Sequence, residues 1–220
     1  YPEADSKQSG ELHPFGDAPT LNGVPALEIP DIGGMASTKT GNGYWLASAD
    51  GQVFAFGDAV HRGDLGAIPV TAPVVDIAVT SDGNGYWLVT SKGIVYAFGT
   101  ALWRGSLGHL ELQAPIVDLE PISTGYGYWL TAADGGVFAF GDAEYLGGLA
   151  DRQLYRPIID LLSSPDGAGY LLVGADGAVY AHGNARFRGS LANNEISSSS
   201  IVAAEQTRDG AGYWLVSQRG

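Results

Sequence analysis

Cysteine is absent from all 220 residues of the chain. Its absence excludes disulfides, thiolate metal sites and cysteine nucleophiles, but it leaves the compartment open because many secreted proteins also lack cysteine. Long apolar runs are absent too: no stretch approaches the roughly 18 residues of a transmembrane helix. We therefore expect no membrane insertion.

Basic residues are scarce. Lys and Arg number 11 against 24 Asp and Glu, which gives a net charge of −13 and a pI near 4.4. Such a surface repels phosphate backbones, so we expect no nucleic-acid partner. Hydrophobic residues still make up 45% of the chain, which excludes generic disorder and allows a substantial core. The chain starts at Tyr1 instead of methionine, so we expect a trimmed or mature fragment.

One phrase is abundant. "DGGVFAFGDA" at 134–143 nearly duplicates "DGQVFAFGDA" at 50–59, and weaker copies occupy 92–101 and 176–185. The tyrosine of the "GYW" or "GYL" motif recurs at spacings of 42, 42, 42 and 43 residues, as Tyr44, Tyr86, Tyr128, Tyr170 and Tyr213. Self-similarity at a period of this length is typical of repeat architectures.

Each repeat contains four short runs rich in β-branched and aromatic residues, separated by glycine-rich turns. In the second repeat they are 73–80, 85–91, 93–99 and 101–107. Runs of this kind predict strands, and no stretch has a sustained helical period. Segments such as "YWLV" and "VFAF" are apolar on both faces, so each sheet must be covered on both sides. Four strands and about 42 residues per repeat predict the blade of a β-propeller.

The repeat pattern also predicts closure of the ring. A half repeat at 10–24 and a half repeat at 199–220 are complementary, and Gly10 and Gly220 are separated by 210 residues, five periods of 42. We expect an all-β, five-bladed β-propeller of four-stranded antiparallel blades over 10–220, closed by pairing of these halves. Closure would remove exposed sheet edges. Residues 1–9 are interpreted as a polar linker.

The motifs "NGYWLASADGQVFAFGDA" and "GYGYWLTAADGGVFAFGDA" resemble a repeat of the type "GYWLVASDGGVFAFGDA" in secreted and surface proteins of actinobacteria. The resemblance covers residues 10–220. It implies an extracellular or cell-surface module appended to other domains, with no catalytic motif of its own. The five-bladed architecture is also similar to that of the lectin tachylectin, although the sequence motifs differ.

A ring recurs in the fourth run of four of the five repeats, and arginine follows it in three; the first repeat has Leu21-Asn22 instead. The candidate ligand-binding residues are His61, Arg62, Trp103, Arg104, Tyr145, Phe187 and Arg188. A ring beside a guanidinium suits a sugar or carboxylate, because the ring stacks while arginine donates hydrogen bonds. The alternative is structural: the ring packs between blades and the arginine stem covers the outer edge. Neighbours on a strand face opposite ways, so these pairs are not clamps by default.

Three aspartates recur in the first run of successive repeats: Asp76, Asp118 and Asp160. We expect them near a central channel. They would hydrogen-bond to backbone, hold a cation or polar ligand, or serve as the paired acids of a glycosidase. Turn aspartates such as Asp82 and Asp166 are interpreted as turn formers, and the histidines lack metal-ligand spacing.

The tyrosines of the repeat are expected to be core rings with bonded hydroxyls, and Trp45, Trp87, Trp129 and Trp214 to pack on the opposite blade face. Together the patterns predict a monomeric, non-catalytic extracellular binding module without cofactor or metal, recognising glycan or cell-envelope material through repeated weak sites. The first alternative is a protein-interaction or spacer domain, and the second is a glycosidase that uses the channel aspartates.

Overall fold

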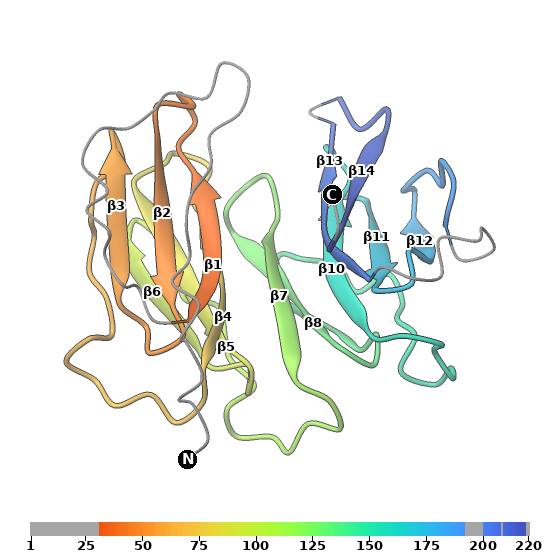
Figure 1. Ribbon diagram of the computed structural model, residues 1–220, viewed down its shortest axis with the longest axis horizontal. Helices are drawn as coiled ribbons and strands as arrows, with labels where there is room; N and C mark the ends of the chain where they lie inside the picture. The colour runs from red at the N-terminus through yellow and green to blue at the C-terminus, as the bar shows by residue number, and fades with distance from the viewer. Residues whose placement is uncertain (1–30, 192–199, 208, 219–220) are drawn as a thin grey trace, which may run out of the picture. The chain divides into compact units, whose positions relative to one another are not determined.

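The computed structural model describes residues 31–191, 200–207 and 209–218, and within them the chain is all-β (Figure 1). No helix able to cross a membrane occurs among these residues. The strands are β1 (Ile32–Ser37), β2 (Gly43–Ser48), β3 (Val53–Gly57), β4 (Val74–Val79), β5 (Gly85–Thr90), β6 (Val95–Gly99), β7 (Ile116–Pro121), β8 (Gly127–Ala132), β9 (Val137–Gly141), β10 (Ile158–Ser163), β11 (Gly169–Gly174), β12 (Val179–Gly183), β13 (Ile201–Gln206) and β14 (Tyr213–Ser217).

The strands form antiparallel sheets in chain order, and the chain divides into two compact units. One unit, 1–90 with 96–101, holds the sheets β1–β2–β3 and β4–β5–β6. The other, 91–95 with 102–220, holds β7–β8–β9, β10–β11–β12 and the two-stranded β13–β14. The prediction of an all-β fold built from antiparallel repeats is confirmed.

The middle strand of each three-stranded sheet is buried along its whole length, in β2, β5, β8 and β11 alike. Tyr128 and Trp129 lie side by side on β8 and point to opposite faces, yet both are 0% exposed. Leu171 fills the place of the indole on β11 and is equally buried. Both faces of these sheets are therefore covered, as the apolar runs predict.

The hairpin between the second and third strands depends on glycine. Gly135 has φ +81°, a conformation that L side chains rarely adopt. A Cβ atom on Gly135 would also lie 2.7 Å from the Cβ of Leu149, so the leucine of the fourth run packs directly beneath the turn. The backbone N–H of Leu149 donates to the Gly135 carbonyl at 2.8 Å. The glycine thus serves both the turn and the close approach of the next segment.

The expectation of four strands in every blade is not met. Four sheets have three strands, β13–β14 has two in the described part of the chain, and no strand forms over 101–107 or its equivalents 59–65, 143–149 and 185–191. Each of these segments contains a glycine with positive φ, such as Gly105 at +145°, which breaks the regular β conformation. The segment is held by isolated hydrogen bonds instead of a ladder.

The prediction for Trp214 is wrong. Its side chain is 60% exposed, whereas Trp45, Trp87 and Trp129 are buried as expected. Trp214 lies on β14, whose sheet lacks a third strand among the described residues. The half repeat at 10–24, and with it the predicted closure of the ring, lies outside the described residues.

Candidate functional site

Every repeat tyrosine from Tyr86 onward fixes the fourth run of the preceding repeat. The Tyr128 hydroxyl accepts a hydrogen bond from the backbone N–H of Arg104 at 3.1 Å and donates one to the carbonyl of Gly105 at 2.7 Å. The same two bonds recur for Tyr86, Tyr170 and Tyr213. Burial raises the pKa of Tyr170 to about 12, so this hydroxyl stays protonated and able to donate. We call this arrangement the tyrosine clamp.

A tryptophan indole holds the same run from its own repeat. Trp129 donates from Nε1 to the carbonyl of Glu144 at 2.8 Å, and Trp45 donates to the carbonyl of Val60 at 3.0 Å. The fourth run therefore has side-chain donors and acceptors on either side of it. It is positioned firmly although it is not a strand.

Between these anchor points one side chain per repeat projects outward. Trp103, Tyr145 and Phe187 are 60%, 59% and 56% exposed. Each directly precedes a residue whose backbone N–H is clamped, namely Arg104, Leu146 and Arg188. We call Trp103, Tyr145 and Phe187 the ring row, and all three lie in the second unit. His61, in the first unit, holds the equivalent position and forms an ion pair with Asp64 at 3.3 Å when protonated.

The residue after the ring packs against the next repeat in three cases, at Arg62, Arg104 and Leu146. The Arg104 guanidinium lies over the Tyr126 ring, 5.6 Å from its centroid, and the Arg104 stem approaches Gly141. The guanidinium of Arg62 donates to Asn84 Oδ1 at 2.8 Å. Leu146 takes the same place with an apolar side chain. The sequence brings ring and arginine together, but the structure turns the ring outward and uses Arg62 and Arg104 to cover the repeat boundary.

The aspartates of the first strands bond to backbone. Asp118 Oδ2 accepts from the N–H of Leu161 at 3.2 Å, and Asp160 Oδ2 accepts from the N–H of Ala204 at 3.0 Å. Each bond joins one repeat to the next within the second unit. Asp76 accepts from the N–H of its neighbour Ile77 at 2.7 Å. Such bonds fit the first of the three roles considered for these residues, which is hydrogen bonding to backbone.

The turn aspartates behave as turn formers. Asp82 accepts from the hydroxyls of Thr80 and Thr100 and from the N–H of Asn84, and these bonds lower its pKa to about 2. Asp166 accepts from Ser164, Ala168 and Asn184, and its pKa is lowered by the same kind of contacts. These carboxylates stay ionised and are already engaged. No group of three or more potential metal ligands occurs in the described segments.

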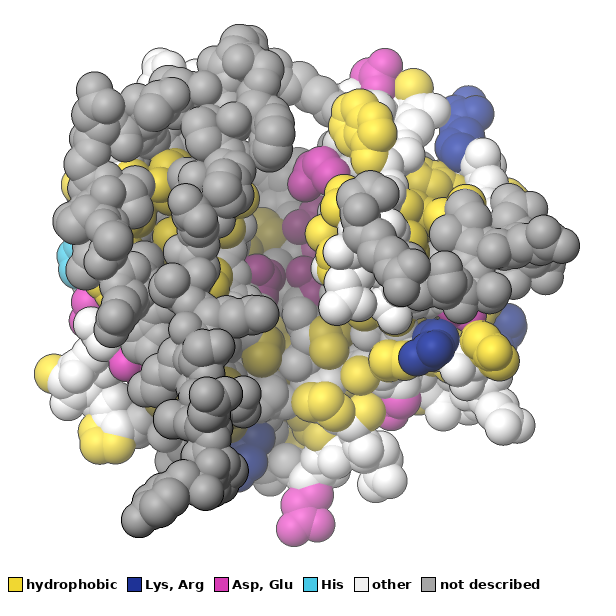
Figure 2. Space-filling view, in the orientation of Figure 1, with side chains coloured by type: hydrophobic (Ala, Val, Ile, Leu, Met, Phe, Trp, Pro, Cys, Tyr) yellow, Lys and Arg dark blue, Asp and Glu magenta, His cyan; other side chains and the backbone are white. Residues whose placement is uncertain are grey.

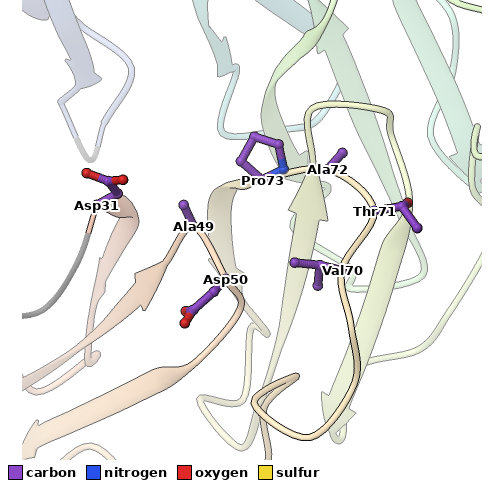
Figure 3. A pocket seen from close by; sticks show the side chains of 7 residues that line it. All are labelled: Asp31, Ala49, Asp50, Val70, Thr71, Ala72 and Pro73. Carbon is purple, nitrogen blue, oxygen red and sulfur yellow. The ribbon is translucent and has the colours of Figure 1, made fainter.

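Two of the hollows on the surface are lined by described residues. One, of about 420 Å³, lies in the first unit between the start of β1, the β2–β3 turn and residues 70–73. Its two carboxylates, Asp31 and Asp50, point away from each other (Figure 3), so they do not converge on a ligand.

The other hollow is a groove of about 480 Å³ in the second unit, where the β10–β11 turn, the β13–β14 turn and the segment after β12 meet. Its polar lining comes from Asp166, Asn184, Arg186, Arg188, Gln206 and Asp209. The sequence singled out Arg188, but it missed the groove, because residues 164–166 and 209–211 join the segment only in the folded chain. The exposed Tyr126, which packs on Arg104, was also missed.

No family model matches the chain, and no curated protein does. Among solved structures, the chain is similar to the β-propeller domain of Myceliophteria thermophila Cps50 (Swd1), with a TM-score of 0.59 and 10% identity over 86% of this chain and 66% of that one. It is also similar to the C-terminal WD40 domain of Sif2, with a TM-score of 0.54 and 15% identity over 87% of this chain. The chain spans 66% of the length of the first structure and 54% of the length of the second. The all-β chain thus has the β-propeller fold.

Proposed function

We propose that this chain is a non-catalytic, monomeric protein-interaction module that binds its partner through the ring row. One observation carries the proposal: Trp103, Tyr145 and Phe187 recur at one place in successive repeats and each is more than half exposed. The adjacent backbone of each is fixed by a tyrosine clamp. Large exposed rings on a rigid frame lose little conformational entropy when they bind, and such rings are enriched at protein interfaces.

The charge of the chain favours a protein over a polyanion. A net charge of −13 repels nucleic acid and anionic lipid at long range. Apolar contacts are short-ranged and are not weakened by this field. Exposed tryptophan, tyrosine and phenylalanine supply such contacts, and the clamped backbone keeps them in place. These features agree with the first alternative of the sequence analysis, a protein-interaction or spacer domain.

Glycan or cell-envelope binding is the second candidate, and Trp103 favours it. An exposed indole offers a flat apolar face on which a sugar can stack. Single stacked sugars bind weakly, so a polymer would have to engage several repeats at once. Extracellular placement and an origin in the actinobacterial repeat family belong to this candidate, on the resemblance of the repeat motif alone. For Asp76, Asp118 and Asp160 we propose a structural role instead of catalysis.

The five-bladed ring belongs to the proposal as well. The complementary half repeats at 10–24 and 199–220 would supply the missing strands of a fifth blade. Two observations support this. The β13–β14 sheet has two strands in the described part of the chain, and the buried Tyr44 hydroxyl has no hydrogen-bond partner there, whereas its equivalents are clamped. Residues 20–21 lie at the clamp offset from Tyr44.

The function is tested by capture with immobilised protein. Wild type is compared with a Trp103→Ala, Tyr145→Ala, Phe187→Ala variant and with the control Tyr155→Ala, which removes an exposed ring outside the row. The captured material is either secreted protein of the source culture or insoluble cell-wall polysaccharide and peptidoglycan. We expect a discrete protein to bind wild type and the control but not the triple variant. Retention of the polysaccharide instead favours the glycan candidate, and equal capture by all three proteins refutes both.

The ring is tested by deletion of residues 212–220, which removes β14 and the clamp tyrosine Tyr213. Loss of a whole strand should exceed the roughly 5–15 kcal/mol of a typical domain. We expect the deleted chain to lose its cooperative thermal transition. A variant with Ser217→Ala serves as the control for handling and expression. A cooperative transition near the wild-type temperature would contradict closure through these residues.

A further inference from the structure

The groove between the sheets β10–β12 and β13–β14 has two arginines and two aspartates in its lining. Arg186 and Arg188 both line it. They flank Phe187, the last member of the ring row. Alternate residues of an extended segment point to opposite sides, so the two arginines share the groove side while the phenylalanine is directed outward. The groove therefore begins where the ring row ends.

The carboxylates that line the groove are already engaged by their own turns. Asp166 accepts from the Ser164 hydroxyl at 2.7 Å, the Ala168 N–H at 3.1 Å and the Asn184 side-chain amide at 2.6 Å. Asp209 accepts from the N–H of Ala211 at 3.0 Å. Backbone and side-chain hydrogen bonds lower the pKa of both groups. The donors of these turns thus bind oxygens of both carboxylates, which stay ionised in the groove lining.

The two guanidinium groups are not paired with acids in the part of the chain that the structure describes. Within 31–191, 200–207 and 209–218, neither Arg186 nor Arg188 forms a salt bridge with a carboxylate. The Arg188 backbone is held by the Tyr213 hydroxyl at 3.1 Å, so the side chain starts from a fixed point. Guanidinium forks bind carboxylates through two parallel hydrogen bonds, which gives direction as well as strength. The groove thus offers two such forks that form no ion pair with a described carboxylate.

We propose that this groove binds the carboxylates of a short acidic peptide segment, with Arg186 and Arg188 as the binding residues and Phe187 contacting an apolar neighbour in the peptide. The inference rests on the proposed function, since it assigns one chemical feature to the protein partner. A volume of about 480 Å³ lies in the usual range of ligand pockets. Asn184 and Gln206 add amide groups beside the two forks.

A peptide fits this site better than a long polyanion. On the face drawn in Figure 2, the Lys and Arg side chains form separate small patches instead of a continuous basic surface. With a net charge of −13, a highly charged polymer would be repelled along most of its length. One or two carboxylates bound at short range avoid this repulsion. The adjacent ring also matches a peptide in which acidic and apolar side chains alternate.

The test measures fluorescence anisotropy of a labelled hexapeptide, Gly-Leu-Glu-Asp-Leu-Gly, beside its neutral Gln-Asn counterpart. The proteins are wild type, Arg186→Gln with Arg188→Gln, and the control Arg152→Gln with Arg156→Gln, which changes net charge equally at exposed positions outside the groove. We expect wild type and the control to bind the acidic peptide within twofold of each other. The groove variant should bind at least tenfold more weakly, and the neutral peptide should not bind.

Several outcomes of this test would overturn the proposal. If both double variants lose peptide binding equally, binding depends on the net charge of the protein and not on the groove. If the acidic and the neutral peptide bind equally, the groove does not recognise carboxylates. An oligogalacturonate is added as a competitor in the same assay. If it binds as tightly as the peptide, the groove recognises uronic acids instead. If the groove variant fails to melt cooperatively, the pair Arg186→Lys and Arg188→Lys keeps the charge and should still weaken binding severalfold. Normal partner capture by the groove variant, with loss in the ring-row variant, would refute the groove and leave the proposed function standing.

Discussion

The hydroxyl of Tyr128 bridges two consecutive backbone groups of the preceding repeat: it accepts from the N–H of Arg104 and donates to the carbonyl of Gly105. These groups belong to a segment without ladder partners. Their hydrogen bonding therefore depends on one side chain of the following repeat. The first prediction follows from this dependence.

Tyr128→Phe should destabilise the protein by roughly 1–3 kcal/mol, because it leaves a part-buried N–H and C=O without their hydrogen-bond partner. The measurement is urea denaturation followed by tryptophan fluorescence. Tyr126→Phe is the control, since Tyr126 is exposed and its hydroxyl makes no clamp to a described segment. If the two variants unfold at the same urea concentration, water replaces the tyrosine and the clamp contributes no stability.

Trp129→Ala should cost roughly 3–5 kcal/mol, because the fully buried indole would leave a cavity and free the Glu144 carbonyl. Trp129→Leu should cost less, since Leu171 fills the equivalent place on β11 with no exposure. Trp103→Ala is the matched control and should change stability by less than about 0.5 kcal/mol. Chemical denaturation of the three variants checks the order. A loss under about 1 kcal/mol for Trp129→Ala would indicate an accessible indole.

Gly105→Ala should be more damaging than Gly189→Ala. Both glycines have positive φ, +145° and +138°, so both substitutions strain the backbone. A Cβ on Gly105 would additionally lie 2.4 Å from Cδ1 of Phe140, whereas no described residue lies within 4 Å of a Cβ on Gly189. We expect about 1 kcal/mol at Gly189 and at least twice that at Gly105. Equal melting temperatures for the two variants would contradict tight packing of the glycine on the phenylalanine ring.

Stability should fall in mild acid because of His182. This histidine replaces the phenylalanine of "FG" and packs 5.5 Å from the Tyr170 ring, and its buried Nε2 has no partner among the described residues. Burial lowers its pKa below the ordinary 6.5, and the charge of Arg152 acts in the same direction, against a backbone hydrogen bond with Leu146. Just below pH 6.5, His182 binds a proton in the unfolded chain but stays neutral in the folded chain. The stability present above pH 6.5 is therefore lost as the pH falls toward the folded-state pKa.

His182→Phe should remove this dependence and raise the melting temperature between pH 5 and 6.5. Thermal unfolding at a series of pH values measures it. His109→Gln, at an exposed position, is the control and should leave the slope of stability against pH as in wild type. A wild-type slope in the His182→Phe variant would assign the acid sensitivity to other groups.

The sequence predicted the three strands of each of the four three-stranded sheets but not the form of the fourth run. The runs 73–80, 85–91 and 93–99 contain β4, β5 and β6, because alternating residues that are apolar on both faces require a covered sheet. The run 101–107 has the same composition, yet Gly105 interrupts it and Tyr128 holds it. A bond to a side chain 24 residues away leaves no periodic signal in the run itself.

The candidate site was only partly accessible to sequence. Alternation on an extended segment predicted that Trp103 and Arg104 face opposite ways, but it did not say which one faces solvent. The answer depends on Tyr126, which receives the guanidinium. The groove at Arg186 and Arg188 could not be predicted from the sequence, because its lining comes from turns that meet only after folding.

All the tyrosine clamps act in the same direction along the chain: each tyrosine binds the repeat that precedes it. Tyr170 secures the end of the repeat before it, and Tyr213 does the same one repeat later, although it reaches back 25 residues instead of 24. Loop length can therefore vary without loss of the bond. Since each repeat is completed by its successor, local opening of β14 frees the segment at Arg188, and opening of β11 frees the segment at Leu146. Fraying within the second unit should advance from later repeats toward earlier ones, and hydrogen exchange at the clamped amides would follow that order.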